Sequence, residues 1–404
     1  MKNIFKSIGP GIVVAATGIG AGDMIAATLG GAKYGYVILW AVVLGGVLKY
    51  VLNEGIGRWQ IISGTSIITA WKIHLPKIFS MVFLVYFLLW SVIVSAALIA
   101  ATGLAAYSLT GVFSVTIWGI IHSFVALAII LFGNYLRFES IMKVIIAMMF
   151  VVVIVSSLLI KPDFYEILKS IAIPILPEGG VKYSLAIIGG VGGSVTLLSY
   201  GYWINEKGWK GKSYKNRIKI DLAIAYVLTT LFGISIVIIA ADLKPSIVSG
   251  SQIVVGLADR MKESTGEIGK WIFLIGFWGA VFSSMLGVWQ GVPYIFADFI
   301  NNFRISKQEE KEENLSKTNY YKWFLISLAI LPIALLIVGK PVWLIMVYSV
   351  AGSLFMPFLA LSLLILNNKI SILKEDKNNI IINLFLVINL VLFLYLGIIE
   401  ILNY

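Results

Sequence analysis

Long apolar runs separated by short polar connectors dominate the amino-acid sequence. A transmembrane helix needs about 20 predominantly apolar residues, and eleven runs of this chain approach or exceed that length. The pattern therefore predicts an all-α polytopic membrane protein, with one transmembrane domain over residues 1–404. The expected spans cover residues 8–31, 35–57, 78–107, 113–133, 140–160, 183–204, 219–241, 267–297, 320–338, 341–366 and 379–403.

Two of the expected spans, the first and the sixth, are interrupted near their middle by clusters of glycine. Each glycine weakens a helix by about 1 kcal/mol relative to alanine, so both spans are expected to break there. Gly-interrupted spans at corresponding positions of two halves are typical of inverted-repeat transporters, although small residues also permit close helix packing. The clusters are Gly18, Gly20 and Gly22 in the first span, and Gly189, Gly190, Gly192 and Gly193 in the sixth.

The two breaks predict a substrate site near the middle of the membrane. A carboxylate at that depth is costly and usually functional, which singles out Asp23 directly after the first break. Unwound backbone offers carbonyl groups to a cation and amide groups to an anion. The expected substrate-binding residues are Asp23, Gly20, Gly22, Thr17, Gly190, Gly193, Ser194 and Thr196, with Asp23 as the candidate metal ligand.

The breaks also divide the chain into two expected repeats. Repeat one would cover about residues 8–160, repeat two about 183–366, and an additional helix about 379–403. The loop between the repeats, residues 161–182, is expected to lack a span.

Composition and charge agree with a membrane protein. The chain is 59% hydrophobic and 13% charged, whereas soluble proteins carry about 25% charged residues. The net charge of +11 is explained by basic cytoplasmic loops, without nucleic acid as a partner. About two thirds of the 31 Lys and Arg residues fall inside if the N-terminus is cytoplasmic, which places the C-terminus outside the cell membrane.

Catalytic and cofactor chemistry lack a basis in the sequence. Cysteine is absent, which excludes thiolate metal sites and disulfides. A phosphate-binding Gly-x-x-x-x-Gly-Lys-Ser/Thr motif is also absent, so we expect no ATPase activity, no enzyme and no cofactor. The expected partners are a small ion or small-molecule substrate and the lipid bilayer, and the protein is expected to be monomeric.

A few further ionisable residues lie within or at the ends of spans. Lys49 and Glu54 in the second span are interpreted as a snorkelling lysine and an interfacial acid, with a gating charge pair as the alternative. Asp221 and Asp298 are placed near the cytoplasmic interface in contact with water, and His122 is interpreted as a hydrogen-bonded structural residue.

The first seventy residues resemble the Nramp family of divalent-metal transporters. The resemblance is carried by Gly9-Pro10-Gly11, Ala32-Lys33-Tyr34-Gly35-Tyr36 and Leu39-Trp40, and later by Arg137-Phe138-Glu139 and Met356-Pro357-Phe358. The span count and the paired breaks agree over nearly the whole chain. The resemblance implies a LeuT-type 5+5 inverted repeat with an eleventh helix, and secondary-active transport by alternating access.

The chain departs from the family's motifs where the metal should bind. The family's Asp-Pro-Gly-Asn corresponds to Gly20, Ala21, Gly22 and Asp23, and its Met-Pro-His to Gly193, Ser194 and Val195. The third span lacks the acids that the family uses for proton transfer. The expectation is a divalent cation, partly hydrated and Mg²⁺-like, at an altered site without the usual proton pathway. The alternative is a small organic solute such as an amino acid or amine, whose amine would pair with Asp23.

Overall fold

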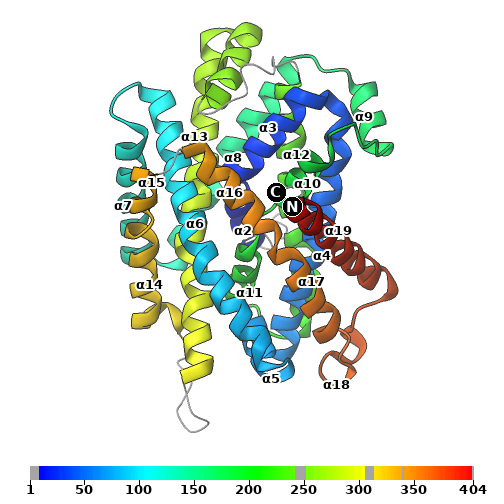
Figure 1. Ribbon diagram of the computed structural model, residues 1–404. Coiled ribbons are helices and arrows are strands. Elements are labelled where there is room, and N and C mark those ends of the chain that lie inside the picture. The colour runs from blue at the N-terminus through cyan, green and yellow to red at the C-terminus, as the bar shows by residue number, and fades with distance from the viewer. Residues whose placement is uncertain (1–8, 242–251, 305–313, 339–340, 403–404) are drawn as a thin grey trace.

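The computed structural model describes residues 9–241, 252–304, 314–338 and 341–402, and these residues form a bundle of helices (Figure 1). The α-helices are α2 Pro10–Gly18, α3 Ala21–Tyr34, α4 Leu39–Ser63, α5 Ile67–His74, α6 Lys77–Thr110, α7 Val115–Phe132, α8 Tyr135–Leu159, α9 Phe164–Ala172, α10 Val181–Gly190, α11 Ser199–Glu206, α12 Lys215–Ala240, α13 Gln252–Arg304, α14 Asn319–Ile330, α15 Ile333–Val338, α16 Pro341–Ser353, α17 Phe355–Leu366, α18 Ile370–Leu373 and α19 Ile380–Leu402. Short 3₁₀ helices are η1 Gly35–Ile38, η2 Val195–Leu198, η3 Lys212–Tyr214, η5 Leu315–Lys317 and η6 Lys374–Asp376.

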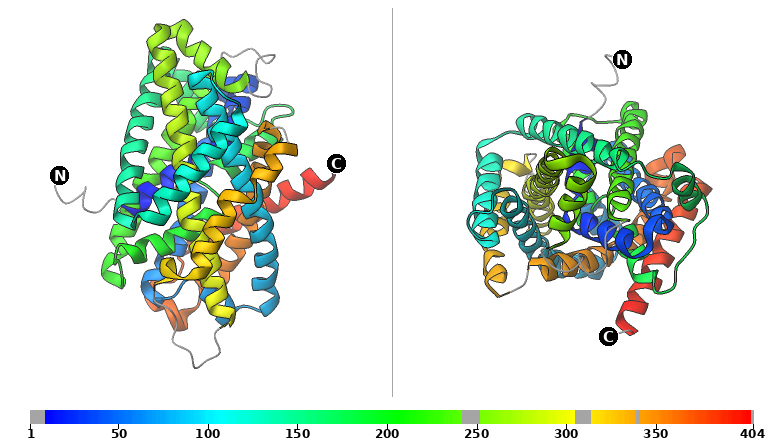
Figure 2. Two further views of the ribbon diagram at one scale, coloured as in Figure 1. Left: turned by 90° about the vertical axis from the view of Figure 1, so that its left-hand side faces the viewer. Right: turned by 90° about the horizontal axis from the view of Figure 1, so that it is seen from above.

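Within the described residues, eight helical stretches are long and apolar enough to cross a membrane, or nine if one bent pair counts as a span. The first expected span is not counted separately, because it is broken and its second half continues into α4. The eleventh appears as a shorter apolar helix over Ile380–Tyr395. Figure 2 shows this last helix, α19, on the outside of the bundle, where it packs against α17 and α4.

Both predicted breaks are confirmed. The first separates α2 from α3 at Ile19 and Gly20, where the backbone leaves the helical conformation. The second separates α10 from η2, and it contains Gly192 and Gly193 with φ of +83° and +84°. Residues with a side chain rarely adopt this left-handed conformation, so the glycines determine where the sixth span unwinds.

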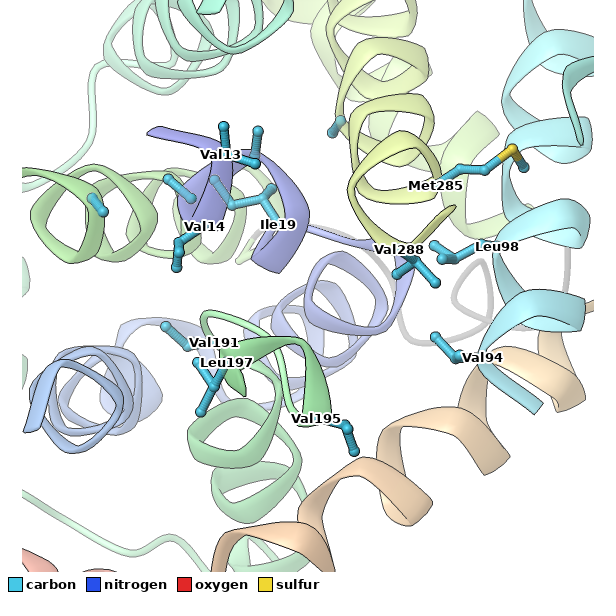
Figure 3. Packing of buried hydrophobic residues seen from close by; sticks show 14 of the residues in the cluster. Val13, Val14, Ile19, Val94, Leu98, Val191, Val195, Leu197, Met285 and Val288 are labelled. Atoms are coloured by element: carbon cyan, nitrogen blue, oxygen red, sulfur yellow. The ribbon is translucent and has the colours of Figure 1, made fainter. Parts of the chain in front are cut away.

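The two breaks contact each other in the interior of the bundle. A Cβ atom on Gly18 would lie 2.6 Å from the carbonyl carbon of Gly192, so only glycine permits this approach. Around them, α2 packs against α8, α12 and α13, while α10 packs against α3, α4 and α16. Figure 3 shows apolar side chains at this level, with Val14 of α2 pointing toward Val191 and Leu197 beside the second break. The site therefore lies in a packed core.

The structure adds two details to the sequence prediction. The loop over residues 161–182 contains α9, whose first turn is capped by the Asp163 carboxylate, which accepts the amides of Tyr165 at 2.9 Å and Glu166 at 3.2 Å. The eighth span, Thr265–Phe303, runs past its predicted end at residue 297. A separate helical segment of α13 precedes it across a break at Gly266, where φ is +76°.

Candidate substrate site between the two broken helices

Asp23 lies in the first turn of α3 and faces the second break. One of its carboxylate oxygens, Oδ2, accepts the amide of Gly20 at 3.4 Å. Its other oxygen, Oδ1, would lie 2.9 Å from a Cβ atom on Gly190, so a side chain there would collide with it. The carboxylate thus sits between the amide end of one half-helix and the glycines of the other, where the helix dipole favours a negative charge.

A small cavity adjoins this carboxylate. Its volume of about 10 Å³ is close to that needed for one water molecule. The Ser194 hydroxyl, which faces Tyr348 across the cavity, is buried and makes no hydrogen bond of normal geometry. A substrate larger than a water molecule or bare ion therefore requires the surrounding helices to move. The cavity is lined by Asp23, Gly189, Gly190, Gly193, Ser194, Tyr348 and Gly352.

The remaining predicted site residues lie around this cavity without lining it. Gly20 contributes its amide to Asp23, and Gly22 lies in the first turn of α3. The Thr17 hydroxyl donates to the Val13 carbonyl at 2.6 Å and is directed at α13. Thr196 lies in η2, directly after the second break.

The interpretation of Lys49 as a snorkelling residue is wrong. Its side chain is 0% exposed, and its ammonium donates to the carbonyl of Gly189 at 3.0 Å and to that of Gly193. Asp23 acts on it electrostatically. One face of α4 carries the small or polar residues Gly45, Lys49 and Asn53 at helical spacing, a signal that this face lies against the sixth span and not against lipid.

Serines of α13 bind the carbonyl end of α2. Ser283 Oγ donates to the Ala16 carbonyl at 3.1 Å, and Ser284 Oγ donates to the Thr17 carbonyl at 2.8 Å. The last carbonyls of a helix lack partners within the helix, so these bonds satisfy groups that the first break exposes. The two serines therefore support the break through interhelical hydrogen bonds.

Asp221 is buried, which corrects its predicted contact with water. It lies on α12 and accepts the amides of Gly9 at 3.0 Å and Gly11 at 2.6 Å, so it caps the N-terminus of α2 from another helix. The Tyr200 hydroxyl of α11 donates to the same carboxylate at 3.1 Å. The Gly9 end of α2 and the start of α11 are therefore both attached to α12.

Asp298 is likewise buried, at 6% exposed. It accepts the hydroxyl of Tyr202 at 2.7 Å and that of Ser66 at 2.5 Å, which connects α11, the start of α5 and α13. Together with Asp221, it holds the broken sixth span in place on the side of the molecule where α2 begins. These contacts attach α11 to α12, to α13 and to the start of α5.

Glu54 is also buried within the protein, at 4% exposed. It forms an ion pair with Arg58 at 3.1 Å, and Arg58 donates further to the Asp376 carbonyl at 2.6 Å and to Asn378 Oδ1 at 2.7 Å. Outside the spans, a hydrogen bond from the Lys215 ammonium lowers the pKa of the Asp376 carboxyl, assisted by Lys212. These contacts join the end of α4 to the loop before α19.

His122 has the structural role that was predicted. Its Nδ1 bonds to the Trp118 carbonyl at 2.8 Å, and its Nε2 accepts the indole N–H of Trp278 at 2.9 Å. A carbonyl accepts and an indole donates, so the ring is neutral with its proton on Nδ1. Both ring nitrogens make hydrogen bonds, so neither is available to bind a metal.

No group of three or more His, Cys, Asp or Glu side chains suited to a metal ion occurs in the part of the chain that the structure describes. A cation at the breaks would therefore meet Asp23, backbone carbonyls and the Ser194 hydroxyl. Such an all-oxygen set suits hard cations such as Mg²⁺, Ca²⁺ or Mn²⁺.

Comparison with known proteins decides the family. The model described as "Natural resistance-associated macrophage protein-like" matches residues 11–403, nearly the whole chain. The chain belongs to the Nramp family. The MntH divalent metal cation transporter of Listeria welshimeri is 23% identical over 292 residues, and the match covers 67% of this chain but only 62% of that protein. The metal transporter Nramp3 of Oryza sativa is 22% identical over 193 residues, covering 46% of this chain and 34% of that protein.

Solved structures show the fold of this Nramp protein. A mutant of the manganese transporter of Eremococcus coleocola superposes with a TM-score of 0.80 at 16% identity, covering 99% of this chain and 86% of that one. The structure of MhsT in complex with L-phenylalanine superposes with a TM-score of 0.58, also at 16% identity, covering 96% and 97%. The predicted LeuT-type fold with broken first and sixth spans is therefore confirmed, and the amino-acid alternative receives no support from the sequence relatives.

Proposed function

We propose that this protein is a secondary-active transporter that carries a divalent cation across the cell membrane by alternating access. The observation that carries the proposal is Asp23, held between two contacting helix breaks in a chain of the Nramp family. Asp23, the backbone carbonyls and the Ser194 hydroxyl offer only oxygen ligands. The proposed substrate is accordingly a hard cation that keeps part of its water, with Mg²⁺ and Mn²⁺ as the test ions.

In an alternating-access cycle, the half-helices of the two broken spans would be the parts that move. The Gly9 end of α2 and the start of α11 are held by Asp221, so opening on that side would separate both from α12. Lys207, which pairs with Glu139 at 2.8 Å, lies beside Gly9, and basic residues favour the cytoplasmic side. We therefore propose that the Gly9 end is cytoplasmic and that the contacts of Asp221 and Asp298 keep this state closed toward it.

A ligand screen tests the substrate class. Purified protein in detergent is heated with Mn²⁺, Mg²⁺ or Ca²⁺, and separately with amino acids and amines, while unfolding is followed. Divalent cations should raise the unfolding temperature of the wild type, because a ligand that binds only the folded state stabilises it. Asp23→Asn should abolish this shift, whereas Glu375→Ala, at a side chain 90% exposed, should keep it. Stabilisation by organic solutes with none by metals would overturn the proposal.

A further inference from the structure

The Lys49 side chain places its nitrogen in the break of the sixth span. In a continuous helix the Gly189 carbonyl would accept the amide of residue 193, but the amide of Gly193 bonds to Gly190 at 3.3 Å. The break therefore leaves the Gly189 carbonyl without its helical partner. The Lys49 ammonium takes that place at 3.0 Å and also binds the Gly193 carbonyl.

These are the groups that a substrate cation would use. Both charged side chains approach the segment from Gly189 to Gly193: a Cβ atom on Gly190 would lie 2.9 Å from Asp23 Oδ1, and one on Gly192 would lie 3.7 Å from the Cβ atom of Lys49. The two formal charges offset each other. A divalent cation added without any rearrangement would leave two positive charges uncompensated in a medium of low dielectric, which is strongly unfavourable.

A second acceptor for the ammonium lies one helical turn away. Asn53 is on the same face of α4, four residues after Lys49, and its side chain is 0% exposed. Its Nδ2 donates to the Tyr226 hydroxyl at 3.1 Å, but its Oδ1 has no hydrogen-bond partner. A buried carbonyl oxygen without a hydrogen-bond partner is unfavourable, and an arriving ammonium would supply the missing donor.

We propose that Lys49 is a specificity-determining residue whose ammonium occupies the cation position at the sixth-span break, and that a substrate cation binds as this ammonium moves from the Gly189 and Gly193 carbonyls toward Asn53. The inference rests on the proposed function, because it assumes that the substrate is a cation. Lys49 then acts as a tethered competitor that weakens cation binding and holds the break in its present geometry.

Metal binding to purified protein tests the competition. Lys49→Met keeps an unbranched side chain, shorter by one atom, and removes its charge, so Mn²⁺ and Mg²⁺ should bind at least tenfold more tightly than to the wild type. Lys72→Met is the matched control, because Lys72 also donates to a backbone carbonyl, that of Asn302, but away from the breaks. Equal affinity in Lys49→Met and wild type would overturn the proposal.

The absence of cysteine permits a chemical rescue. Lys49→Cys can be modified in the unfolded protein, before refolding, with a 2-aminoethyl thiosulfonate that restores an ammonium, or with a neutral propyl reagent of similar length. Only the aminoethyl product should return to wild-type affinity. Equal affinities for the two products would contradict a role for the charge.

A metal-free readout separates this inference from the proposed function. Ser194→Cys places the only thiol beside the break, at a position 3% exposed. It should react with a small thiol reagent at least tenfold faster when combined with Lys49→Met than alone, because the break is no longer held. Unchanged labelling overturns the role of Lys49, whatever the wild type transports, whereas a wild type that moves no metal overturns the proposed function by itself.

Discussion

Replacing Asp221 with asparagine should release the first half-helix from α12. The carboxylate receives three donors, the amides of Gly9 and Gly11 and the Tyr200 hydroxyl. Asparagine has the same shape but a single acceptor oxygen and no charge. Placed to keep the bonds to Gly11 and Tyr200, it directs its NH₂ group at the Gly9 amide, so that two donors face each other.

The size of the expected shift from closed to open molecules follows from these contacts. A hydrogen bond to a charged group contributes about 1.5–3 kcal/mol, and a buried acid at a helix N-terminus contributes up to about 2 kcal/mol. Losing one charge-assisted bond and the favourable dipole interaction should therefore cost about 2–3 kcal/mol. Because every 1.4 kcal/mol is tenfold, the ratio of closed to open molecules should fall by about 30- to 150-fold.

A single cysteine on α2 reports this opening. Thr17→Cys is the only thiol in the chain, and Thr17 is 4% exposed in the closed state. A soluble thiol reagent should label it about 30- to 150-fold faster with Asp221→Asn than without. Tyr200→Phe removes only the 3.1 Å bond and should give an increase of about fivefold, for a loss of about 1 kcal/mol. Equal labelling rates with and without Asp221→Asn would refute the capping argument.

Three further changes test contacts around the site. Arg58→Met leaves Glu54 buried without its partner and should lower the free energy of unfolding by about 3–5 kcal/mol, whereas the double variant with Glu54→Gln should regain part of that loss. Gly18→Ala forces apart the two contacting breaks and should lower the free energy of unfolding, measured with denaturant, by about 1–3 kcal/mol. Gly201→Ala is the control and should lower it less, because its nearest neighbour is a flexible side-chain oxygen at 3.3 Å. The pKa of Asp376 is lower in the folded protein than in the unfolded chain, where it is about 3.9. Its carboxylate therefore stabilises the fold at pH values above about 3.9, and this stabilisation is lost as the pH falls through the folded pKa. Asp376→Asn should accordingly flatten the pH dependence of the unfolding temperature below about pH 4.

The breaks were predictable because glycine acts locally. Gly192 and Gly193 adopt a conformation that other residues rarely reach, so the sequence alone indicates where the sixth span unwinds. Gly18 has a different role, since it permits contact with the other break. That contact joins segments far apart in the chain, and the glycine pattern indicates it only through the expected correspondence of the two halves.

The partners of the buried charges were harder to predict. Hydropathy places Lys49 at a depth in the span but does not state which way it points, and snorkelling is the usual outcome for a lysine near a span end. The polar face formed with Asn53 would have indicated an inward direction. Similarly, α2 begins at Gly9-Pro10 with no capping side chain of its own, so its amides needed a partner from elsewhere. The sequence does not identify that partner as Asp221.

The missed helix α9 did carry a local signal. Asp163 and Glu166 follow the spacing of a capping box, an acid at the cap followed three residues later by a second. The hydropathy of residues 161–182 predicts a loop, because hydropathy alone identifies only helices that span the membrane. Predicting amphipathic helices between spans therefore requires capping patterns as well as hydropathy.

Ion flux into proteoliposomes tests the central claim most directly. Vesicles containing the wild type and a trapped divalent-ion indicator are exposed to external Mn²⁺ or Mg²⁺, with Asp23→Ala and the exposed-site control Glu375→Ala in parallel. The wild type and Glu375→Ala should show saturable uptake, and Asp23→Ala should match empty vesicles, because it removes the carboxylate between the breaks. Absence of divalent uptake by folded wild type, or undiminished uptake by Asp23→Ala, would contradict the account.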